Sequence, residues 1–236
     1  MNKLYFVPYA GGSSVTFKMW KSILKPEIDF RIFELAGHGK RIFDDCYNSM
    51  QEACEDLYNT LKNDVSTDEV YFLSGHCMGA IIAYETCKLI KDRGEISLPH
   101  RLFLSGHGAP IYIHNEKNIK DRDKEGLVQF LIDEGGTTEE YLDDELLELI
   151  LPAIKSDAKI YEEYEYHEDT DLSSIPITIL YGTNDKKTPM NEVKAWDKFS
   201  NSIEYVEFNS DHYFINSCYE KYLDIIKNRI EADIHE

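Results

Sequence analysis

Six short runs of β-branched and aromatic residues alternate with longer segments of helical spacing, and this alternation constrains the fold more than any other feature. The runs cover residues 3–9, 29–35, 69–75, 101–106, 177–182 and 203–208. The helical segments cover about 15–25, 49–64, 78–93, 191–200 and 217–231. Strands that alternate with helices are typical of a mostly parallel sheet with helices on both faces. The nearly continuous apolar character of the strands agrees with this, because a parallel sheet is buried on both sides. We therefore predict an α/β fold.

The stretch between the fourth and fifth strand-like runs is the exception to this alternation. Residues 107–175 contain no convincing strand and carry two or three helical patterns, with breaks predicted at Gly135–Gly136 and before Pro152. A helical insertion between two core strands indicates a lid over one end of a sheet. A chain of 236 residues is long enough for one sizeable core. We predict a single domain over residues 1–236, with residues 107–175 as its helical lid.

Cysteine usage, hydropathy and charge exclude several classes of function. The five cysteines are odd in number and form no Cys-x-x-Cys pair, which argues for a reducing, cytoplasmic location. No apolar run approaches the roughly 18 residues of a membrane span, and the first residues lack the apolar core of a signal peptide. The formal net charge of −19 argues against nucleic acid as a partner. No histidine or cysteine pair has metal-ligand spacing, and neither glycine-rich loop matches a phosphate or dinucleotide fingerprint, so we expect no metal and no cofactor.

Residues 75–79 read G-H-C-M-G and lie between a strand-like run and a helix-like run. A strand that turns at once into a helix needs glycines beside the apex, because side chains there would clash with neighbouring elements. The apex residue, Cys77, is then held in a strained conformation with its thiol above the sheet. The dipole at the helix N-terminus favours a thiolate, and the Met78 backbone N–H can point at a developing oxyanion. We interpret Cys77 as a nucleophile and Met78 as an oxyanion-hole residue.

Two further residues follow Cys77 in the order that α/β-hydrolase triads have, which is nucleophile, acid, histidine. Asp185 lies three residues after Gly182, in the loop that follows a buried strand, and His212 lies in the loop after the last strand. Asp211 is the competing acid. Adjacent residues rarely orient one another's rings, so Asp185 is favoured as the partner of His212.

The loop after the first strand is expected to supply the second oxyanion donor. Its sequence, Y-A-G-G-S-S at residues 9–14, has small side chains that let backbone N–H groups approach a substrate closely. We predict the Ala10 amide as this donor, with Gly11 next.

Six ordered motifs extend over nearly the whole chain and together point to one protein family. In chain order they are V-P-Y-A-G-G-S-S-V-T-F-K-M-W, E-L-A-G-H-G-K-R, G-H-C-M-G-A-I-I-A-Y-E, L-F-L-S-G-H-G-A-P, L-P-A-I-K-S-D-A-K-I-Y-E-E-Y-E-Y, and the pair Y-G-T-N-D-K-K-T-P and D-H-Y-F-I. This pattern resembles the type II (external, editing) thioesterases of nonribosomal peptide and polyketide synthases. The chain departs from that family where it has Ala36 and His38 in place of the usual Pro and Arg, and Cys77 in place of Ser.

The resemblance implies an α/β-hydrolase fold with a helical lid. It also implies hydrolysis of acyl or aminoacyl thioesters on phosphopantetheinyl carrier proteins, as proofreading in nonribosomal peptide and polyketide synthesis. Carried over by position, Cys77 is the nucleophile, Asp185 the acid and His212 the base, while Ala10 and Met78 supply the oxyanion amides. The implied partner is a carrier protein, no resident cofactor is implied, and we expect a monomer.

The cysteine leaves the fate of the acyl group open. A cysteine nucleophile converts one thioester into another, so acylation is nearly thermoneutral and reversible. Water as the acceptor makes the chain an editing hydrolase, which the whole-chain resemblance favours. A second carrier-protein thiol or an amine as the acceptor makes it an acyltransferase. The third alternative is a non-catalytic α/β-hydrolase-like binding module.

Overall fold

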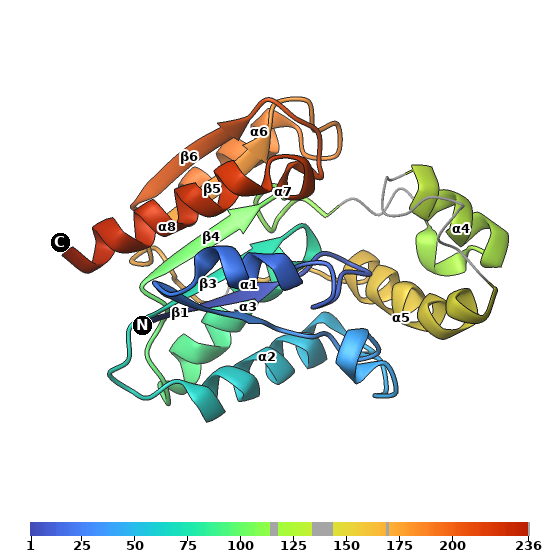
Figure 1. The fold of residues 1–236 in the computed structure, drawn as a ribbon, viewed down its shortest axis with the longest axis horizontal. Helices are drawn as coiled ribbons and strands as arrows, with labels where there is room; N and C mark the ends of the chain where they lie inside the picture. Colours follow the sequence, from blue (N-terminus) through green and yellow to red (C-terminus); the bar gives the residue numbers. More distant parts are fainter. Residues whose placement is uncertain (114–117, 134–143, 169, 236) are drawn as a thin grey trace.

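The six strand-like runs pair into one parallel sheet, which confirms the predicted fold class. The computed structural model describes residues 1–113, 118–133, 144–168 and 170–235. The strand order is β2–β1–β3–β4–β5–β6, and each neighbouring pair is parallel (Figure 1). The strands are β1 Asn2–Val7, β2 Ile28–Ile32, β3 Tyr71–His76, β4 Arg101–Ser105, β5 Ile177–Gly182 and β6 Ile203–Phe208.

Helices cover both faces of this sheet. The α-helices are α1 Lys18–Leu24, α2 Met50–Asp64, α3 Met78–Arg93, α4 Lys124–Asp133, α5 Asp144–Glu162, α6 Met190–Lys194, α7 Phe214–Ser217 and α8 Tyr219–His235. Short 3-10 turns lie at η1 Gly39–Arg41, η2 Ile119–Asp121 and η4 Ala195–Lys198. One face packs on α1, α7 and α8, and the other packs on α2, α3 and the α6–η4 segment.

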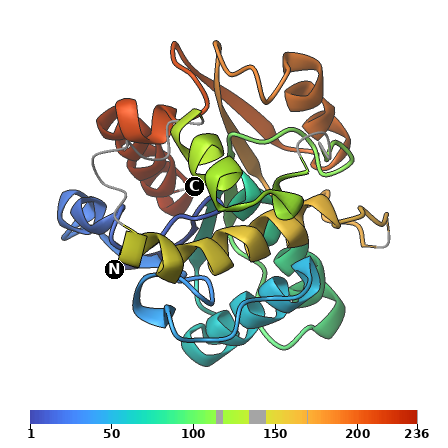
Figure 2. The same cartoon turned by 90° about the vertical axis from the view of Figure 1, so that its right-hand side faces the viewer.

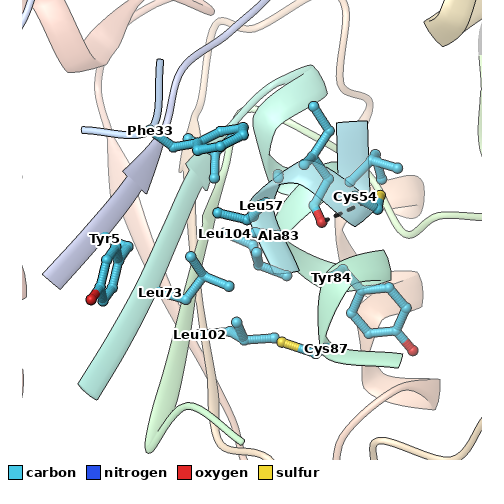
Figure 3. Close-up of a cluster of buried hydrophobic side chains, with 14 of the residues drawn as sticks. Tyr5, Phe33, Cys54, Leu57, Leu73, Ala83, Tyr84, Cys87, Leu102 and Leu104 are labelled. Atoms are coloured by element: carbon cyan, nitrogen blue, oxygen red, sulfur yellow. Dashed lines mark hydrogen bonds between the residues drawn. The ribbon is translucent and has the colours of Figure 1, made fainter. Parts of the chain in front are cut away.

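The buried core is split by the sheet into two clusters, because successive strand residues point to opposite faces. In β1, Leu4 and Phe6 join the cluster under α1 and α8, whereas Tyr5 and Val7 join the cluster under α2 and α3. Figure 3 shows the second cluster, in which leucines of β3 and β4 face apolar residues of α2 and α3. The central strands are thus buried on both sides, and they hold the ends from which the site loops emerge.

Helices α4 and α5, which lie between β4 and β5 in the sequence, lie beyond the carboxyl ends of the strands (Figure 1). In the view of Figure 2, α5 crosses in front of the sheet with α4 beside it. The described part of residues 107–175 contains helices and no strand. That this segment is a lid, within one domain over residues 1–236, stays a prediction. Within the described ranges, no helix has both the length and the apolar character that a membrane crossing needs.

The helix break predicted before Pro152 is wrong. Helix α5 runs through Pro152, which lies inside it. Proline removes one backbone donor from a helix and strains the preceding turn. Here Leu151, Ala153 and Ile154 are all buried beside it, and this packing holds the turn helical against the local preference. The break predicted at Gly135–Gly136 lies outside the described residues.

Candidate active site

The turn from β3 into α3 holds Cys77 in a backbone conformation that non-glycine residues rarely adopt. Its φ is 54° and its ψ −122°, and it is the N-cap of α3. The Cys77 N–H donates to the Ser105 carbonyl of β4 at 2.8 Å, and the Cys77 carbonyl accepts from the Ala80 N–H at 2.9 Å. A strained residue fixed from both sides in this way is typical of a functional site. The structure therefore has the sharp strand-to-helix turn that the sequence predicts.

The two glycines of the turn are required by close backbone contacts. A Cβ atom on Gly75 would overlap the carbonyl group of Gly79. A Cβ atom on Gly79 would overlap the Val7 and Pro8 carbonyl oxygens at the end of β1. These contacts bring the N-terminus of α3 directly against the strand that carries the 9–14 loop.

His212 and Asp185 lie beside Cys77, although they are distant from it in the sequence. The His212 Nδ1 is 2.8 Å from the Asp185 Oδ2, and the same ring lies close enough to the Cys77 thiol to lower the pKa of that thiol. Asp185 Oδ1 accepts from the Lys187 N–H at 2.8 Å, which fixes the carboxylate. Cys77 is half-buried, whereas both partners are buried. The structure thus brings the three predicted residues together in the order thiol, imidazole, carboxylate.

The competing acid, Asp211, has a different position. Its Oδ1 accepts from the Tyr213 N–H at 3.0 Å, so it closes a turn in its own loop. The Asp211 carbonyl oxygen lies 2.5 Å from where a Cβ of Gly182 would be. Gly182 therefore lets the histidine loop pack on the end of β5, next to Asp185.

The charges of Cys77 and His212 stabilise each other. Burial alone would raise the pKa of the Cys77 thiol, but the His212 ring, Lys187 and the Met78 N–H outweigh it and hold that pKa below its ordinary value. Burial opposes a charge on His212, but the Cys77 thiolate and the Asp185 carboxylate raise its pKa to about 9. Each charged form therefore favours the other, and a thiolate beside an imidazolium is a reactive form of cysteine.

A second histidine, His76, packs against His212 and carries no charge. His76 is completely buried, with Nδ1 2.9 Å from the Ser105 Oγ and its ring centroid 5.2 Å from that of His212. Burial, and then the positive charge of His212, hold the pKa of His76 well below its usual range. His76 is therefore neutral and adds no positive charge of its own beside the His212 imidazolium.

We expect the reactivity of Cys77 to show this pairing directly. Iodoacetamide alkylation, followed by peptide mapping between about pH 5 and 9, should give Cys77 a midpoint below that of an ordinary thiol at about 8.5. Cys46 is an internal control, because burial and the nearby Asp157 raise its pKa. His212→Gln should move the Cys77 midpoint upward, since burial then acts without the imidazolium. A Cys77 midpoint at or above that of Cys46 would contradict the ion pair.

The two predicted oxyanion donors differ in their surroundings. The Met78 N–H lies close enough to the Cys77 sulfur to lower the pKa of the thiol. Ala10 is exposed, and within the part of the chain that the structure describes its N–H donates no hydrogen bond. The Gly11 N–H, the second choice from the sequence, instead donates to Asp157 Oδ2 at 2.7 Å. The Ala10 amide is therefore free for a ligand, and the Gly11 amide is engaged.

Several residues around the sulfur were not predicted from the sequence. Burial and the charge of Cys77 raise the pKa of the hydroxyls of Tyr161 and Tyr213, which places both near the thiolate. The Tyr161 hydroxyl is 2.7 Å from the Nε2 of His107. Repeated tyrosines in the 161–166 stretch were the available signal, but their spacing does not say which of them turns inward. Among the described residues, no cluster of three or more His, Cys, Asp or Glu side chains is placed to hold a metal ion.

The chain is similar to known proteins over almost its full length. Residues 2–233 match a family model described as thioesterase domain. The chain is 27% identical over 230 residues to thioesterase PikA5 of Streptomyces venezuelae, an alignment that covers 97% of this chain and 80% of that protein. Among solved structures it is similar to ClbQ from the colibactin NRPS/PKS pathway, with a TM-score of 0.91, 29% identity and coverage of 99% and 98% of the two chains. It is also similar to YbtT, a type II thioesterase from the yersiniabactin NRPS/PKS pathway, with a TM-score of 0.85, 28% identity and coverage of 98% and 94%.

Proposed function

The chain belongs to the thioesterase domain family, and from this premise we propose that it clears acyl groups from the phosphopantetheine arms of carrier proteins through Cys77, His212 and Asp185. Thioester hydrolysis is the activity of this family, and the similar proteins include a type II thioesterase of a nonribosomal peptide and polyketide pathway. One observation supports the residue assignment above all others. It is the contact of His212 with the Cys77 sulfur on one side and with Asp185, at 2.8 Å, on the other.

The first half of the reaction transfers the acyl group to the enzyme. The Cys77 thiolate attacks the thioester carbonyl carbon, and the carbonyl electrons move onto its oxygen. The Met78 and Ala10 N–H groups stabilise this oxyanion. When the intermediate collapses, the bond to the pantetheine sulfur breaks and the His212 imidazolium gives its proton to that sulfur. The products are acyl-Cys77, a neutral His212 and the free carrier thiol.

The second half removes the acyl group with water. Acyl-Cys77 carries no charge, so the main influence that raises the pKa of His212 is gone and the imidazole becomes a general base. His212 takes a proton from water, the oxygen attacks the acyl carbon, and the Cys77 thiolate leaves. The free acid departs and the thiolate–imidazolium pair is restored. Asp185 stays ionised throughout, because burial raises its pKa less than His212 and the Lys187 N–H lower it.

The proposed reaction steps do not depend on which acyl group the thioester carries, and this fits an editing role. The attacking groups contact only the thioester itself, so any short acyl or aminoacyl group that enters the site is a substrate. The partner that delivers such groups is an acyl or peptidyl carrier protein. Removal of a stalled or wrongly primed acyl group then frees the carrier for another cycle of synthesis.

Intact-protein mass spectrometry tests this function. The protein is mixed with a carrier protein whose phosphopantetheine arm carries an acetyl group. We expect the carrier to lose its acetyl group, free acetate to accumulate, and a transient 1:1 acetyl adduct to map to Cys77.

The other two functions give different outcomes in the same experiment. An adduct that only a second, unloaded carrier protein can discharge would show an acyltransferase. A carrier that stays loaded, with no adduct on Cys77, would show a non-catalytic binding module. Either result would overturn the proposed hydrolysis.

A further inference from the structure

Asp157 of α5 lies near the site but is not part of the triad, and its carboxylate is deeply buried. It is 1% exposed. Its Oδ2 accepts from the Gly11 N–H at 2.7 Å and lies 3.0 Å from the Nε2 of His38. One carboxylate oxygen therefore joins three segments: the helix between β4 and β5, the loop after β1 and the loop after β2.

His38 completes a buried charge pair with Asp157. It is 5% exposed, and its Nδ1 lies 3.0 Å from the Ala36 carbonyl oxygen. A carbonyl only accepts, so Nδ1 carries a proton, and Nε2 faces a carboxylate. Burial lowers the pKa of His38, but the charge of Asp157, its hydrogen bond, the Ala36 carbonyl and Glu34 together raise it above the ordinary value. His38 thus lies buried beneath α5.

Close packing reinforces this connection at two glycines. Gly11 has a φ of 78°, and a Cβ on it would lie 3.6 Å from the Ile154 side chain. Gly37 has a φ of 82°, and a Cβ on it would lie 3.0 Å from the Ala153 Cβ. One turn of α5 thus lies directly on both loops, and the position of the Gly11 backbone depends on where α5 sits.

We propose that Asp157 is a positioning residue, which holds the loop of residues 9–12 so that the neighbouring Ala10 amide points at the Cys77 site only while α5 is seated. The inference rests on the proposed function, since it gives the Ala10 amide its role. The Tyr9 carbonyl oxygen accepts from the Gly12 N–H at 2.8 Å, and this carbonyl shares one planar peptide unit with the Ala10 N–H. Anchoring the Gly11 N–H inside the same turn therefore also holds the unit that carries the Ala10 amide. The seated α5 therefore couples closure over the substrate to completion of the oxyanion hole.

Single-turnover acylation by the acetyl-loaded carrier protein tests this proposal. Asp157→Ala should slow acylation by about 100-fold, the effect of misplacing a reacting group by about 1 Å. Asp157→Asn should recover most of the rate, because its amide oxygen can still accept from the Gly11 N–H. Ser156→Ala is the matched control, since Ser156 Oγ also bonds α5 to the body, at 2.6 Å from the Tyr47 carbonyl oxygen, without touching the loop of Ala10. It should acylate at the wild-type rate.

Iodoacetamide alkylation of Cys77 distinguishes a misplaced Ala10 amide from a general disruption of the active site. Alkylation needs the thiolate but no oxyanion hole, so its rate should change by less than about threefold in Asp157→Ala. If that variant does not fold, Asp157→Glu replaces it. The longer side chain keeps the charge and displaces the oxygens, and it should slow acylation at least about fivefold.

Three results would overturn the inference. The first is an Asp157→Ala variant, or Asp157→Glu in its place, that acylates at the wild-type rate. The second is the same variant losing acylation and alkylation equally. Either of these two results would leave the proposed function intact. A wild-type protein that never forms the acetyl adduct would overturn the inference together with the proposed function.

Discussion

Replacing Cys77 with alanine is expected to lower kcat for hydrolysis of acetyl-loaded carrier protein by at least about 10⁴-fold. The reaction proposed above passes through an acyl group on the Cys77 sulfur, so a methyl side chain removes the covalent route altogether. The oxyanion amides remain, and they leave a small residual rate. Thermal unfolding should change little, because alanine keeps the Cβ and the backbone of the turn. Steady-state release of carrier thiol measures the first quantity, and calorimetry the second.

Cys77→Ser is the matched variant for this prediction. Serine keeps a nucleophile at the same strained position, so hydrolysis should persist and the acyl-enzyme becomes an oxygen ester. A serine hydroxyl carries no negative charge, and the thiolate is the largest influence that raises the pKa of His212. The pKa of His212 should therefore fall below about 9, and the basic form should be available at lower pH. Retention of more than about a tenth of the wild-type rate in Cys77→Ala would exclude Cys77 as the nucleophile.

The sequence was sufficient for the parts of the fold that local patterns determine. The strand and helix runs were found because each has its own periodicity and its own boundaries. The turn at Cys77 was found because G-x-C-x-G between a strand and a helix allows only one tight geometry. Asp185 and His212 were placed beside it by topology, since the carboxyl ends of neighbouring parallel strands meet at one edge of the sheet.

The parts that the sequence did not reveal are contacts between distant segments. Asp157 and Gly11 are separated by 146 positions, and nothing local to either residue marks the other as its partner. His38 lies in a loop and its local sequence does not mark it as buried. It is buried because α5 packs on that loop. The path of α5 through Pro152 is a further case, because tertiary burial outweighed a strong local preference. Such contacts depend on how the segment between β4 and β5 packs on the sheet.

Gly79→Ala is expected to lower the free energy of unfolding by about 3 to 4 kcal/mol. The added methyl group would overlap the carbonyl oxygens of Val7 and Pro8, which are backbone atoms and cannot rotate away. Either α3 or the end of β1 has to move. Because β1 leads into the loop that carries Ala10, acylation of Cys77 should also slow in the molecules that stay folded. Urea denaturation measures the stability, and single-turnover acylation below the transition measures the activity.

Gly94→Ala provides the control within the same helix. Gly94 is the C-cap of α3 with a φ of 64°, and a Cβ on it would meet nothing within 4 Å. Its substitution therefore adds only left-handed backbone strain, about 1 kcal/mol, and should leave acylation unchanged. The difference between the two variants isolates the steric contact of α3 with β1 from the general effect of replacing a glycine. Equal losses of stability, or a Gly79→Ala protein that acylates normally, would mean that the turn tolerates a side chain and that its glycines do not hold the oxyanion loop against Cys77.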